Sequence, residues 1–400
     1  MRKVLVRGPF LTQSGYGEHA RFVLRALRSQ EDQFDIYAIN TNWGNTNWLW
    51  EDSEERRWFD GLIEKTADYL RAASGPSLDA FDMSLQVTIP NEWERLCPEN
   101  IGVTAGIETT RVAPEWIEKS KQMSGIVTIS EHSKNVYEGT SYTAQDKTTG
   151  DIVDDFKVDT PISVVHYPVK NTEPADIKFD LKTDFNFLTV AQWSPRKNIE
   201  NTIKWFVEEF IDQEVGLIVK SSLAKNCVYD RLRVSAAIKR LLEPYPQRKC
   251  KVYLLHGFLT EEEMTTLYRD DRVKAYLSLS HGEGFGLPMF EVAYNGVPIV
   301  APAWSGYVDF LYMPVKDKKS KVKNKPMFST VEYTVQKIPE QVVWEGVLHQ
   351  DSSWCVPEQG SCKMRLREMY KDYGRFKSRA NRLKTWVHEN FEESAQYGKF

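Results

Sequence analysis

Short apolar runs alternate with amphipathic helical patterns along the whole chain. The runs have the length of strands, and many of the segments between them repeat apolar residues at helical spacing. The strands that we expect lie at 3–6, 34–38, 84–88, 102–104, 125–129, 162–165, 185–190, 215–220, 251–255, 275–280 and 298–301. Strands that alternate with helices in this way predict an α/β architecture built on parallel sheets.

A polar stretch at residues 170–183 divides the expected strands into two sets. It contains Pro174 and many charged residues, which is typical of a linker between domains. We therefore predict two Rossmann-like domains, over residues 1–170 and 184–374. The remaining residues, 375–400, begin with a basic helical pattern.

The composition narrows the class of protein. The chain has 400 residues, of which 41% are hydrophobic, so it can bury sizeable cores. Its formal net charge of -4 provides no global basic field for nucleic acid. We find no run of membrane-spanning length and no signal-peptide pattern at the start. Five scattered cysteines without a Cys-x-x-Cys pair predict neither zinc nor a disulfide framework, and therefore a reduced, cytoplasmic protein.

Two glutamates bracket a glycine-rich segment between an expected strand and an expected helix. Seven residues separate Glu283 from Glu291. Pro288 stands where a helix accepts proline, so Glu283 lies in the loop and Glu291 in the first helical turns. Unpaired N–H groups at a helix start can bind phosphate, and carboxylates can accept hydrogen bonds from sugar hydroxyls. The combination predicts a site for a glycosyl diphosphate, whereas a plain turn would leave the two acids unexplained.

Adjacent cations stand at the start of another expected helix. Arg196 and Lys197 follow the strand 185–190 and precede a helical pattern at 199–210. Positive charge at a helix N-terminus opposes the helix dipole, so this placement is unfavourable unless an anion binds there. We therefore predict that both side chains bind phosphate, with a solvated helix start as the alternative.

The first expected strand leads into a glycine-rich loop. The stretch Gly15-Tyr-Gly17-Glu-His-Ala20 fits the dinucleotide fingerprint, but the second strand ends at Asn40, without the acid that the fingerprint requires. A loop that approaches a diphosphate fits these residues better, and a tight turn alone is the alternative.

The segment from Glu283 to Glu291, with the following Asn295-Gly-Val-Pro-Ile-Val300, resembles the donor-site signature of the family 4 retaining glycosyltransferases. The resemblance covers nearly the whole chain and is strongest at residues 186–311 and at the first glycine loop. It implies the GT-B fold, in which two Rossmann-like domains face each other across a cleft. It further implies that the last helix, within 375–400, returns to the first domain. The implied reaction moves a sugar, with retention of configuration, from a UDP-linked donor to a hydroxyl.

The resemblance also implies roles for the matching residues. Glu283 would contact the donor sugar as a catalytic residue, and Glu291 would hold the ribose hydroxyls. The other donor-binding residues that it implies are Gly15, Gly17, Arg196, Lys197, Lys220, Gly284, Phe285, Gly286 and Leu287. The base would lie at a loop around His256, which could equally be a core histidine.

The chain departs from the family pattern at two places. Gln192 stands where one familiar version has arginine. No histidine follows the strand 102–104, where many members place one near the donor sugar. Glu108 is the polar residue in that region, and we expect it to be catalytic. The sequence contains no Asp-x-Asp or His-Glu-x-x-His motif, so we expect a metal-independent reaction with no cofactor besides the nucleotide sugar.

Two features bear on the acceptor. Residues 316–325 hold six lysines within an excursion, 313–358, that is longer than in the family, and Trp43 and Trp48 open an aromatic-rich segment. A solvated loop and packed aromatic rings would explain both features, whereas a polyanionic acceptor is the functional alternative. On that alternative, the acceptor-binding residues are Lys318, Lys319, Lys321, Lys323, Trp43 and Trp48.

The amino-acid sequence at residues 7–19 and 106–116 also resembles that of transferases carried by tailed bacteriophages. Some such enzymes glycosylate hydroxymethylated bases in DNA. We therefore expect 5-hydroxymethylcytosine in duplex DNA as acceptor and the host cytoplasm as location. The alternatives are a transferase of cell-surface or lipid-linked glycan synthesis, a non-catalytic GT-B protein that binds sugar nucleotides, and an epimerase or phosphorylase.

Overall fold

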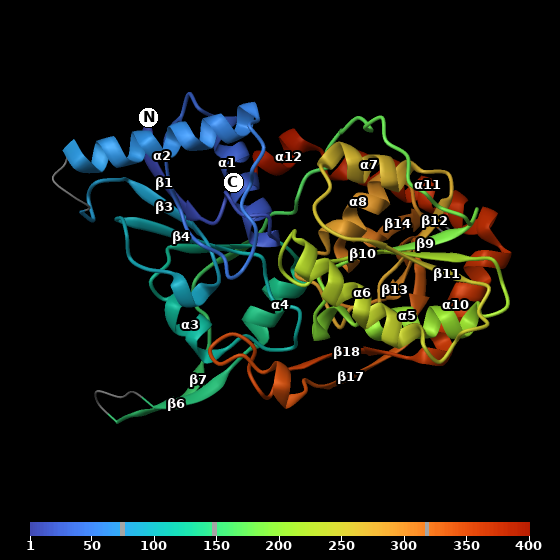
Figure 1. Cartoon of the computed structure of the whole chain (residues 1–400). Coiled ribbons are helices and arrows are strands. Elements are labelled where there is room, and N and C mark those ends of the chain that lie inside the picture. The colour runs from blue at the N-terminus through green and yellow to red at the C-terminus, as the bar shows by residue number, and fades with distance from the viewer. Residues whose placement is uncertain (73–76, 146–149, 317–319) are drawn as a thin grey trace. The chain divides into compact units, whose positions relative to one another are not determined.

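The computed structural model describes residues 1–72, 77–145, 150–316 and 320–400 (Figure 1). Contacts divide the chain into two compact units. Unit 1 comprises Met1–Pro168, Lys337–Ser353 and Glu393–Phe400, and unit 2 comprises Val169–Gln336 and Trp354–Glu392. Each unit is built on one parallel six-stranded sheet, which confirms the predicted α/β class.

The sheet of unit 1 has the strand order β2-β1-β3-β4-β5-β8, and all its neighbours are parallel. Its strands are β1 (Arg2–Gly8), β2 (Phe34–Asn40), β3 (Met83–Val87), β4 (Glu99–Thr104), β5 (Gly125–Thr128) and β8 (Ile162–Val164). Every strand expected in the first half of the chain is present, with its ends within three residues of the prediction. The order changes direction between β1 and β3, which makes their carboxyl ends the switch point of the sheet.

Helices pack on this sheet through their apolar faces. They are α1 (Gly15–Arg28), α2 (Glu54–Ala72), α3 (Pro114–Ser120), α4 (Glu131–Gly139) and α12 (Glu393–Tyr397), with a 3-10 turn η1 at Pro90–Glu92. In α1 the residues Phe22, Val23 and Leu27 are buried at helical spacing. A hairpin of β6 (Tyr142–Gln145) and β7 (Ile152–Phe156) completes the unit.

The sheet of unit 2 has the strand order β11-β10-β9-β12-β13-β16, again with parallel neighbours. Its strands are β9 (Asn186–Val190), β10 (Gly216–Lys220), β11 (Lys251–Leu255), β12 (Val273–Leu277), β13 (Ile299–Pro302) and β16 (Ser329–Val331). This is the strand order of the dinucleotide-binding Rossmann sheet, and its switch point lies between β9 and β12. The strands expected in the second half of the chain are all present.

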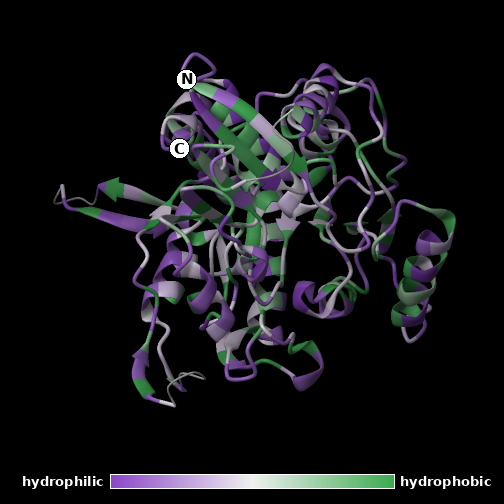
Figure 2. Cartoon of the chain, turned by 90° about the vertical axis from the view of Figure 1, so that its left-hand side faces the viewer, coloured by the Kyte–Doolittle hydropathy of each residue, from purple (hydrophilic) through white to green (hydrophobic). Residues whose placement is uncertain are grey.

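Helices of the chain carry hydrophobic and hydrophilic residues together along their length (Figure 2). The helices of unit 2 are α5 (Ile199–Glu209), α6 (Val228–Leu242), α7 (Glu261–Arg269), α8 (Leu287–Asn295), α9 (Val308–Leu311), α10 (Gln359–Lys371) and α11 (Tyr373–Asn390), with a 3-10 turn η2 at Pro195–Lys197. The 3-10 turn η3 at Glu340–Val342 belongs to unit 1. One core joins Phe187 and Leu217 of the sheet to Phe206 of α5 and Leu366 of α10.

The excursion at 313–358 is structured and is shared between the units. It forms the hairpin β14 (Tyr312–Lys316) and β15 (Val322–Pro326), then β16, and then the pair β17 (Tyr333–Lys337) and β18 (Ser353–Pro357). The segment 337–353 belongs to unit 1, where Val347 is buried in a core with Trp93 and Trp116. The Asn91 side chain donates a hydrogen bond to the Gly346 carbonyl (2.7 Å).

Two segments lie differently from the sequence-based expectation. The stretch 170–183 belongs to unit 2, because the Arg272 guanidinium donates hydrogen bonds to the carbonyls of Phe179 (3.0 Å) and Leu181 (3.2 Å). The first helix of the 375–400 segment, α11, also belongs to unit 2, and only Glu393–Phe400 joins unit 1. The sequence pattern carried no signal for these tertiary contacts.

Candidate functional site

The switch point of the unit 2 sheet gathers the residues that the sequence singled out. The loop and 3-10 turn after β9 carry Arg196 and Lys197, and the loop after β12 carries Glu283. Because β9 and β12 are parallel neighbours, their carboxyl ends open at the same edge of the sheet. In open α/β sheets, ligands bind in the crevice at this position.

Glu283 is the centre of a charged cluster at this edge. Its side chain is buried, with 9% of the residue surface exposed. The Lys197 ammonium lies 2.6 Å from each carboxylate oxygen, and the Arg196 guanidinium lies 3.1 Å from one of them. Burial by itself would raise the pKa of Glu283, but Lys197 and Arg196 outweigh burial and lower this pKa to about 2. The carboxylate is therefore ionised throughout the neutral range.

The two cations are held in place by the backbone around them. Arg196 also donates to the Gly282 carbonyl (2.7 Å), and its own carbonyl accepts a hydrogen bond from the His281 N–H (2.9 Å). Asn198, which ends the 3-10 turn, has a left-handed backbone (φ 53°), a conformation that asparagine tolerates. Its side chain donates to the Leu279 carbonyl (3.1 Å). These bonds join the loop after β9 to the loop after β12.

A tightly packed loop supports Glu283 from the other side. The Glu283 N–H donates to the Ser305 hydroxyl (2.8 Å), and Ser305 itself has a positive φ of 69°. A side chain at Gly306 would place its Cβ 1.8 Å from the Gly284 carbonyl oxygen. Sequence reasoning missed Ser305 and Gly306, because they lie beyond the strand that follows the motif.

The glycine-rich motif leads directly into α8. Gly286 has a φ of 90° at the helix start, and Leu287 is the first helical residue. Phe285 packs its ring against Phe290 and Phe310, so only its backbone can face a ligand. The structure thus places Gly284, Phe285, Gly286 and Leu287 in one turn beside Glu283, as backbone groups.

Glu291, in the middle of α8, lies close to Lys220, the last residue of β10. The Tyr268 hydroxyl donates to a Glu291 carboxylate oxygen (2.6 Å). The Lys220 ammonium donates to the Gly257 carbonyl (2.5 Å). Burial lowers the pKa of Lys220, and the nearby Glu291 carboxylate acts against that shift. Lys220 therefore stands at the same edge of the sheet as the Glu283 cluster, on the neighbouring strand.

A second buried network, absent from the sequence-based prediction, fixes the loops after β10 and β11. Asp230 accepts hydrogen bonds from the N–H groups of Leu223, Ala224 and Lys225 (2.7–2.9 Å). It is also hydrogen-bonded to His256 Nε2 (2.8 Å). Burial alone would raise the pKa of Asp230, but the hydrogen bonds that it accepts lower it to about 2. His256 has a buried side chain that joins the loops after β10 and β11.

The glycine loop of unit 1 lies at the switch point of its own sheet. Ser14 caps α1, because its hydroxyl accepts a hydrogen bond from the Gly17 N–H (2.9 Å). A Cβ at Gly17 would lie 2.2 Å from the Thr12 carbonyl oxygen, whereas a Cβ at Gly15 would meet nothing within 4 Å. Gly17 is therefore required by the turn, and Gly15 is free for a role outside it.

The tryptophan-rich segment packs beside this loop. Trp48 pairs with Thr12 in a β-bridge, and the ring of Trp43 lies 4.2 Å from that of Tyr16. Trp48 is 48% exposed and Trp50 is 68% exposed. The segment therefore exposes the side chains of Trp48 and Trp50 to solvent.

Glu108 follows β4 at the same edge of the unit 1 sheet. Tyr16 and Thr104 share a hydrogen bond between their hydroxyls (2.9 Å), which ties α1 to the end of β4. Burial raises the pKa of the Tyr16 phenol, and the Glu108 carboxylate adds to that rise. Glu108 belongs to unit 1 and Glu283 to unit 2, so the two catalytic candidates stand on different sheets.

The lysine run lies on the β14–β15 hairpin of unit 2. Lys321 and Lys323 are exposed there, while Lys318 and Lys319 lie outside the described residues. Within the described ranges, no group of three or more histidine, cysteine or acidic residues could hold a metal ion. No helix in those ranges is long and apolar enough to cross a membrane.

Three solved structures have this fold over the full length of the chain. Sucrose-phosphate synthase from Thermosynechococcus elongatus aligns with a TM-score of 0.61 at 11% identity and is covered to 97%. A glycosyltransferase from Rickettsia africae gives 0.60 at 10% identity, with 96% covered. Anabaena HepE, solved with UDP and glucose, gives 0.56 at 10% identity, with 98% covered. The chain therefore has the GT-B fold of nucleotide-sugar glycosyltransferases.

Sequence comparison reaches less far. No family model matches the chain. The serotype-specific mannosyltransferase WbdA of Escherichia coli is 27% identical over 158 residues, which are 38% of this chain. The chain spans only 18% of that relative's length.

Proposed function

We propose that the protein is a retaining glycosyltransferase that uses a nucleotide-diphosphate sugar. The observation that carries this proposal is the cluster of Glu283, Lys197 and Arg196 at the switch point of the unit 2 sheet. A buried carboxylate beside two cations offers a hydrogen-bond acceptor for a sugar and positive charge for a diphosphate. The epimerase and phosphorylase readings would use the same groups, and the transfer assay below separates them.

Each residue has a distinct task in the proposed reaction. Arg196 and Lys197 bind the donor phosphates and stabilise the negative charge that develops on the leaving diphosphate. Glu283 accepts hydrogen bonds from the donor sugar, and Glu291 accepts them from the ribose. The bond from the anomeric carbon to the diphosphate breaks while the acceptor oxygen bonds to that carbon on the same face. The acceptor proton passes to the departing diphosphate oxygen.

The donor that we propose is UDP-linked. The solved structure of HepE with UDP and glucose supports this choice, because its fold aligns with the full chain. On this proposal, Lys220 and the loop at His256–Gly257 lie near the nucleoside. Gly15 and Glu108 of unit 1 are proposed to take part in the reaction, Gly15 with the donor diphosphate and Glu108 with the acceptor hydroxyl.

The acceptor that we propose is 5-hydroxymethylcytosine in duplex DNA, as in the phage enzymes that the sequence resembles. Exposed lysines on the β14–β15 hairpin support it, because they can contact phosphates. The open rings of Trp48 and Trp50 support it as well, because an indole can stack on a base that has left the duplex.

A saccharide is the second candidate acceptor. The partial likeness to the mannosyltransferase WbdA favours it, and exposed tryptophans also stack on sugars. The five cysteines are all free thiols, which supports a reducing compartment and thus a cytoplasmic location, in a host cell if the gene belongs to a phage.

The experiment offers UDP-sugars with three acceptors: duplex DNA containing 5-hydroxymethylcytosine, the same duplex with cytosine, and an oligosaccharide. A mass increase on the modified base alone supports the proposed acceptor. Transfer to the oligosaccharide with none to DNA would replace it with the second candidate. Hydrolysis of the donor without transfer would show that the protein binds and activates the donor but uses none of the offered acceptors. The Glu283→Gln variant is the control, and it must abolish this hydrolysis. A protein that neither hydrolyses nor transfers any donor is a binding protein, contrary to the proposal.

A further inference from the structure

Helix α11 of unit 2 carries a dense set of cations on its outer face. Its sequence from Tyr373 to Asn390 contains three arginines, two lysines and one histidine before the first acid, Glu389. Its apolar residues Phe376, Ala380, Leu383 and Val387 are buried against the unit. Arg375 and Arg382 are exposed, whereas Lys377, Arg379 and Lys384 are half-buried beside the apolar stripe that holds the helix in place.

These cations repel one another. Burial lowers the pKa of Lys377, and the neighbouring Lys384 and Lys274 lower it further, while Asp271 acts weakly in the other direction. Burial likewise lowers the pKa of Arg379, and Arg375 and Arg382 add to that effect. Like charges at this spacing cost free energy that a bound anion would recover.

Few of the cations have an acidic partner. Arg375 pairs with Asp372 (2.8 Å), and Lys377 donates to the Gly296 carbonyl (2.8 Å) at the end of α8. In the described part of the chain, no ion pair joins Arg382 or Lys384 to a carboxylate. Arg382 is exposed and is therefore available to an external ligand, whereas Lys384 is half-buried beside Gly296.

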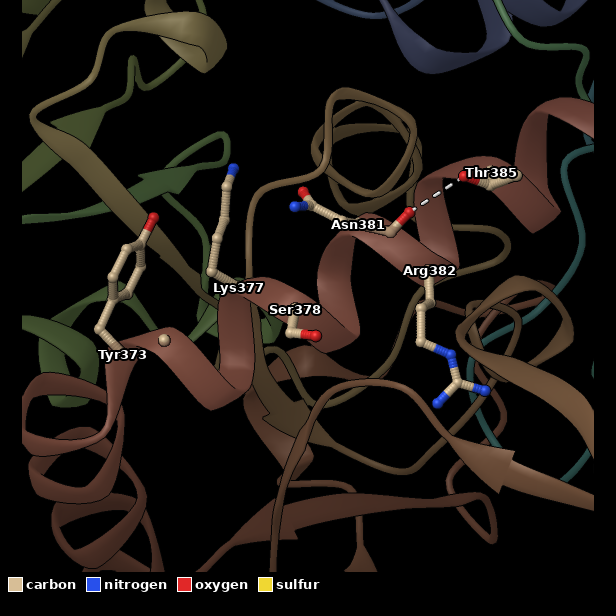
Figure 3. Close-up of a pocket in the computed structure, with 7 residues that line it drawn as sticks. Tyr373, Lys377, Ser378, Asn381, Arg382 and Thr385 are labelled. Carbon is tan, nitrogen blue, oxygen red and sulfur yellow. Dashed lines mark hydrogen bonds between the residues drawn. The ribbon is translucent and has the colours of Figure 1, made fainter. Parts of the chain in front are cut away.

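A shallow hollow of about 590 Å³ runs along this face. Figure 3 shows six side chains that contribute to its lining, each of which carries a polar or charged group. They are Tyr373, Lys377, Ser378, Asn381, Arg382 and Thr385. Lysine, arginine, hydroxyl and amide groups are the side chains that bind phosphate oxygens in protein–DNA complexes.

We propose that this face of α11 binds the phosphodiester backbone of duplex DNA. From Tyr373 to Thr385 the helix rises by about 18 Å, at 1.5 Å per residue. Successive phosphates of one strand are about 3.4 Å apart along the duplex, so the face can follow about five of them. The inference rests on the proposed DNA acceptor and adds a second contact surface, separate from the β14–β15 hairpin.

An anionic membrane is the other polyanion to consider. Helices that lie on membranes insert an exposed apolar face between the headgroups. Here the apolar residues of α11 are buried, and the hollow offers hydroxyl, amide and cationic groups instead. The chemistry of the face therefore favours phosphodiesters that remain in water.

The test measures binding of the full protein to an unmodified 20-base-pair duplex by fluorescence anisotropy over a range of salt concentrations. The variant is the pair Lys377→Glu and Arg382→Glu, the two cations that line the hollow. The matched control is the pair Arg233→Glu and Arg240→Glu, which changes two exposed arginines of α6 in the same unit. Thermal melting and UDP-sugar binding must equal those of the parent protein in both variants.

We expect the α11 variant to bind the duplex at least tenfold more weakly than the parent protein. The slope of log affinity against log salt should fall in magnitude by about two. The control pair should change affinity less than twofold. Equal losses in both variants, no loss in the α11 variant, or binding to phosphatidylserine vesicles in preference to the duplex would each overturn the proposal.

The outcome is separable from that of the proposed acceptor. A duplex affinity that depends on α11 without sugar transfer to modified DNA would support the surface and refute the acceptor. If sugar is transferred to modified DNA but the affinity for the duplex does not depend on α11, the acceptor would be supported and the α11 surface refuted.

Discussion

Lys197 holds its ammonium 2.6 Å from both carboxylate oxygens of Glu283, although the two residues are 86 positions apart in the chain. The contact pairs the buried carboxylate of Glu283 with a cation. When a diphosphate binds, the same ammonium can be shared between the carboxylate and a phosphate oxygen. The pair therefore links binding of the leaving group to the position of the sugar-facing acid.

We predict that replacing Arg196 and Lys197 together by alanine raises the donor dissociation constant at least tenfold, which is about 1.4 kcal/mol. The same change leaves Glu283 buried without its partners, so it should also lower the melting temperature. Adding Glu283→Gln should restore much of the stability and none of the donor affinity. Calorimetric titration with UDP-sugar checks the first effect, and unchanged affinity in the double variant would contradict it.

The two glutamates of the motif should separate in kinetics. Glu283→Gln should depress turnover by at least a hundredfold with a smaller change in donor KM, because its contact strengthens as the sugar reacts. Glu291→Gln should mainly raise the donor KM, because it holds the nucleoside. Tyr268→Phe removes only the hydroxyl that donates a hydrogen bond to Glu291, so it serves as the milder control for that position. Equal effects of the two glutamine variants on turnover would argue against separate roles.

Asp230 should make the stability of unit 2 depend on acid pH. Its pKa in the folded protein is lowered to about 2, so its contribution is present above the unfolded value near 3.8 and is lost as pH falls toward 2. The difference corresponds to about 2 kcal/mol at pH 7. Asp230→Asn should therefore destabilise the protein at pH 7, and the gap to the parent should narrow below about pH 4. Denaturant titrations at pH 7, 5 and 3 measure this gap, with the exposed Asp212→Asn as control. A gap that is constant over this range would exclude the carboxylate as its source.

The two glycines of the first loop should respond differently to alanine. Gly17→Ala would drive a Cβ to 2.2 Å from the Thr12 carbonyl oxygen, so the loop must shift. Such overpacking costs about 1–3 kcal/mol. Gly15→Ala meets no atom within 4 Å and should leave stability unchanged, while reducing donor turnover if the diphosphate approaches there. Thermal melting and steady-state rates of the two single variants provide the comparison. A stable Gly17→Ala protein would show that the turn adapts.

Arg272 should keep the segment between the two sheets, residues 170–183, in a fixed conformation. Its guanidinium holds the carbonyls of Phe179 and Leu181, and Asp270 fixes the guanidinium in turn (2.7 Å). Arg272→Ala should speed amide hydrogen exchange in residues 177–182 several-fold, with little change in the strands of unit 2. Arg269→Ala, on the adjacent helix, is the matched control. Equal protection of 177–182 in both variants would mean that other contacts hold the segment.

The sequence predicted the strands well because strand length and apolar runs are local properties. It also brought Arg196 and Glu283 to one place, since both follow strands that a Rossmann sheet sets side by side. It did not predict that Lys197 would bind Glu283 directly. It also gave no sign of Ser305, whose positive φ and hydroxyl support the motif from a later loop. Such contacts depend on side-chain packing between distant segments, which no periodicity records.

The same limit explains the differences in domain organisation. Charge and proline content at 170–183 are typical of a mobile linker, but hydrogen bonds from Arg272, Thr266 and other residues of unit 2 hold the segment on that unit. The lysine-rich composition at 316–325 is typical of a solvated loop, whereas residues 322–325 lie in strand β15, which pairs with β14. Composition describes what a segment prefers in isolation, and long-range hydrogen bonds decide where it lies.

The chain passes between the units four times, after Pro168, Gln336, Ser353 and Glu392. A gene fragment that ends at the first crossing would encode unit 1 without Val347, which is buried in its core, and without the closing residues 393–400. Recombination between related genes at a single breakpoint would therefore yield two incomplete halves. New pairings of donor and acceptor specificity in this lineage should arise by substitution within the loops, and seldom by exchange of whole units.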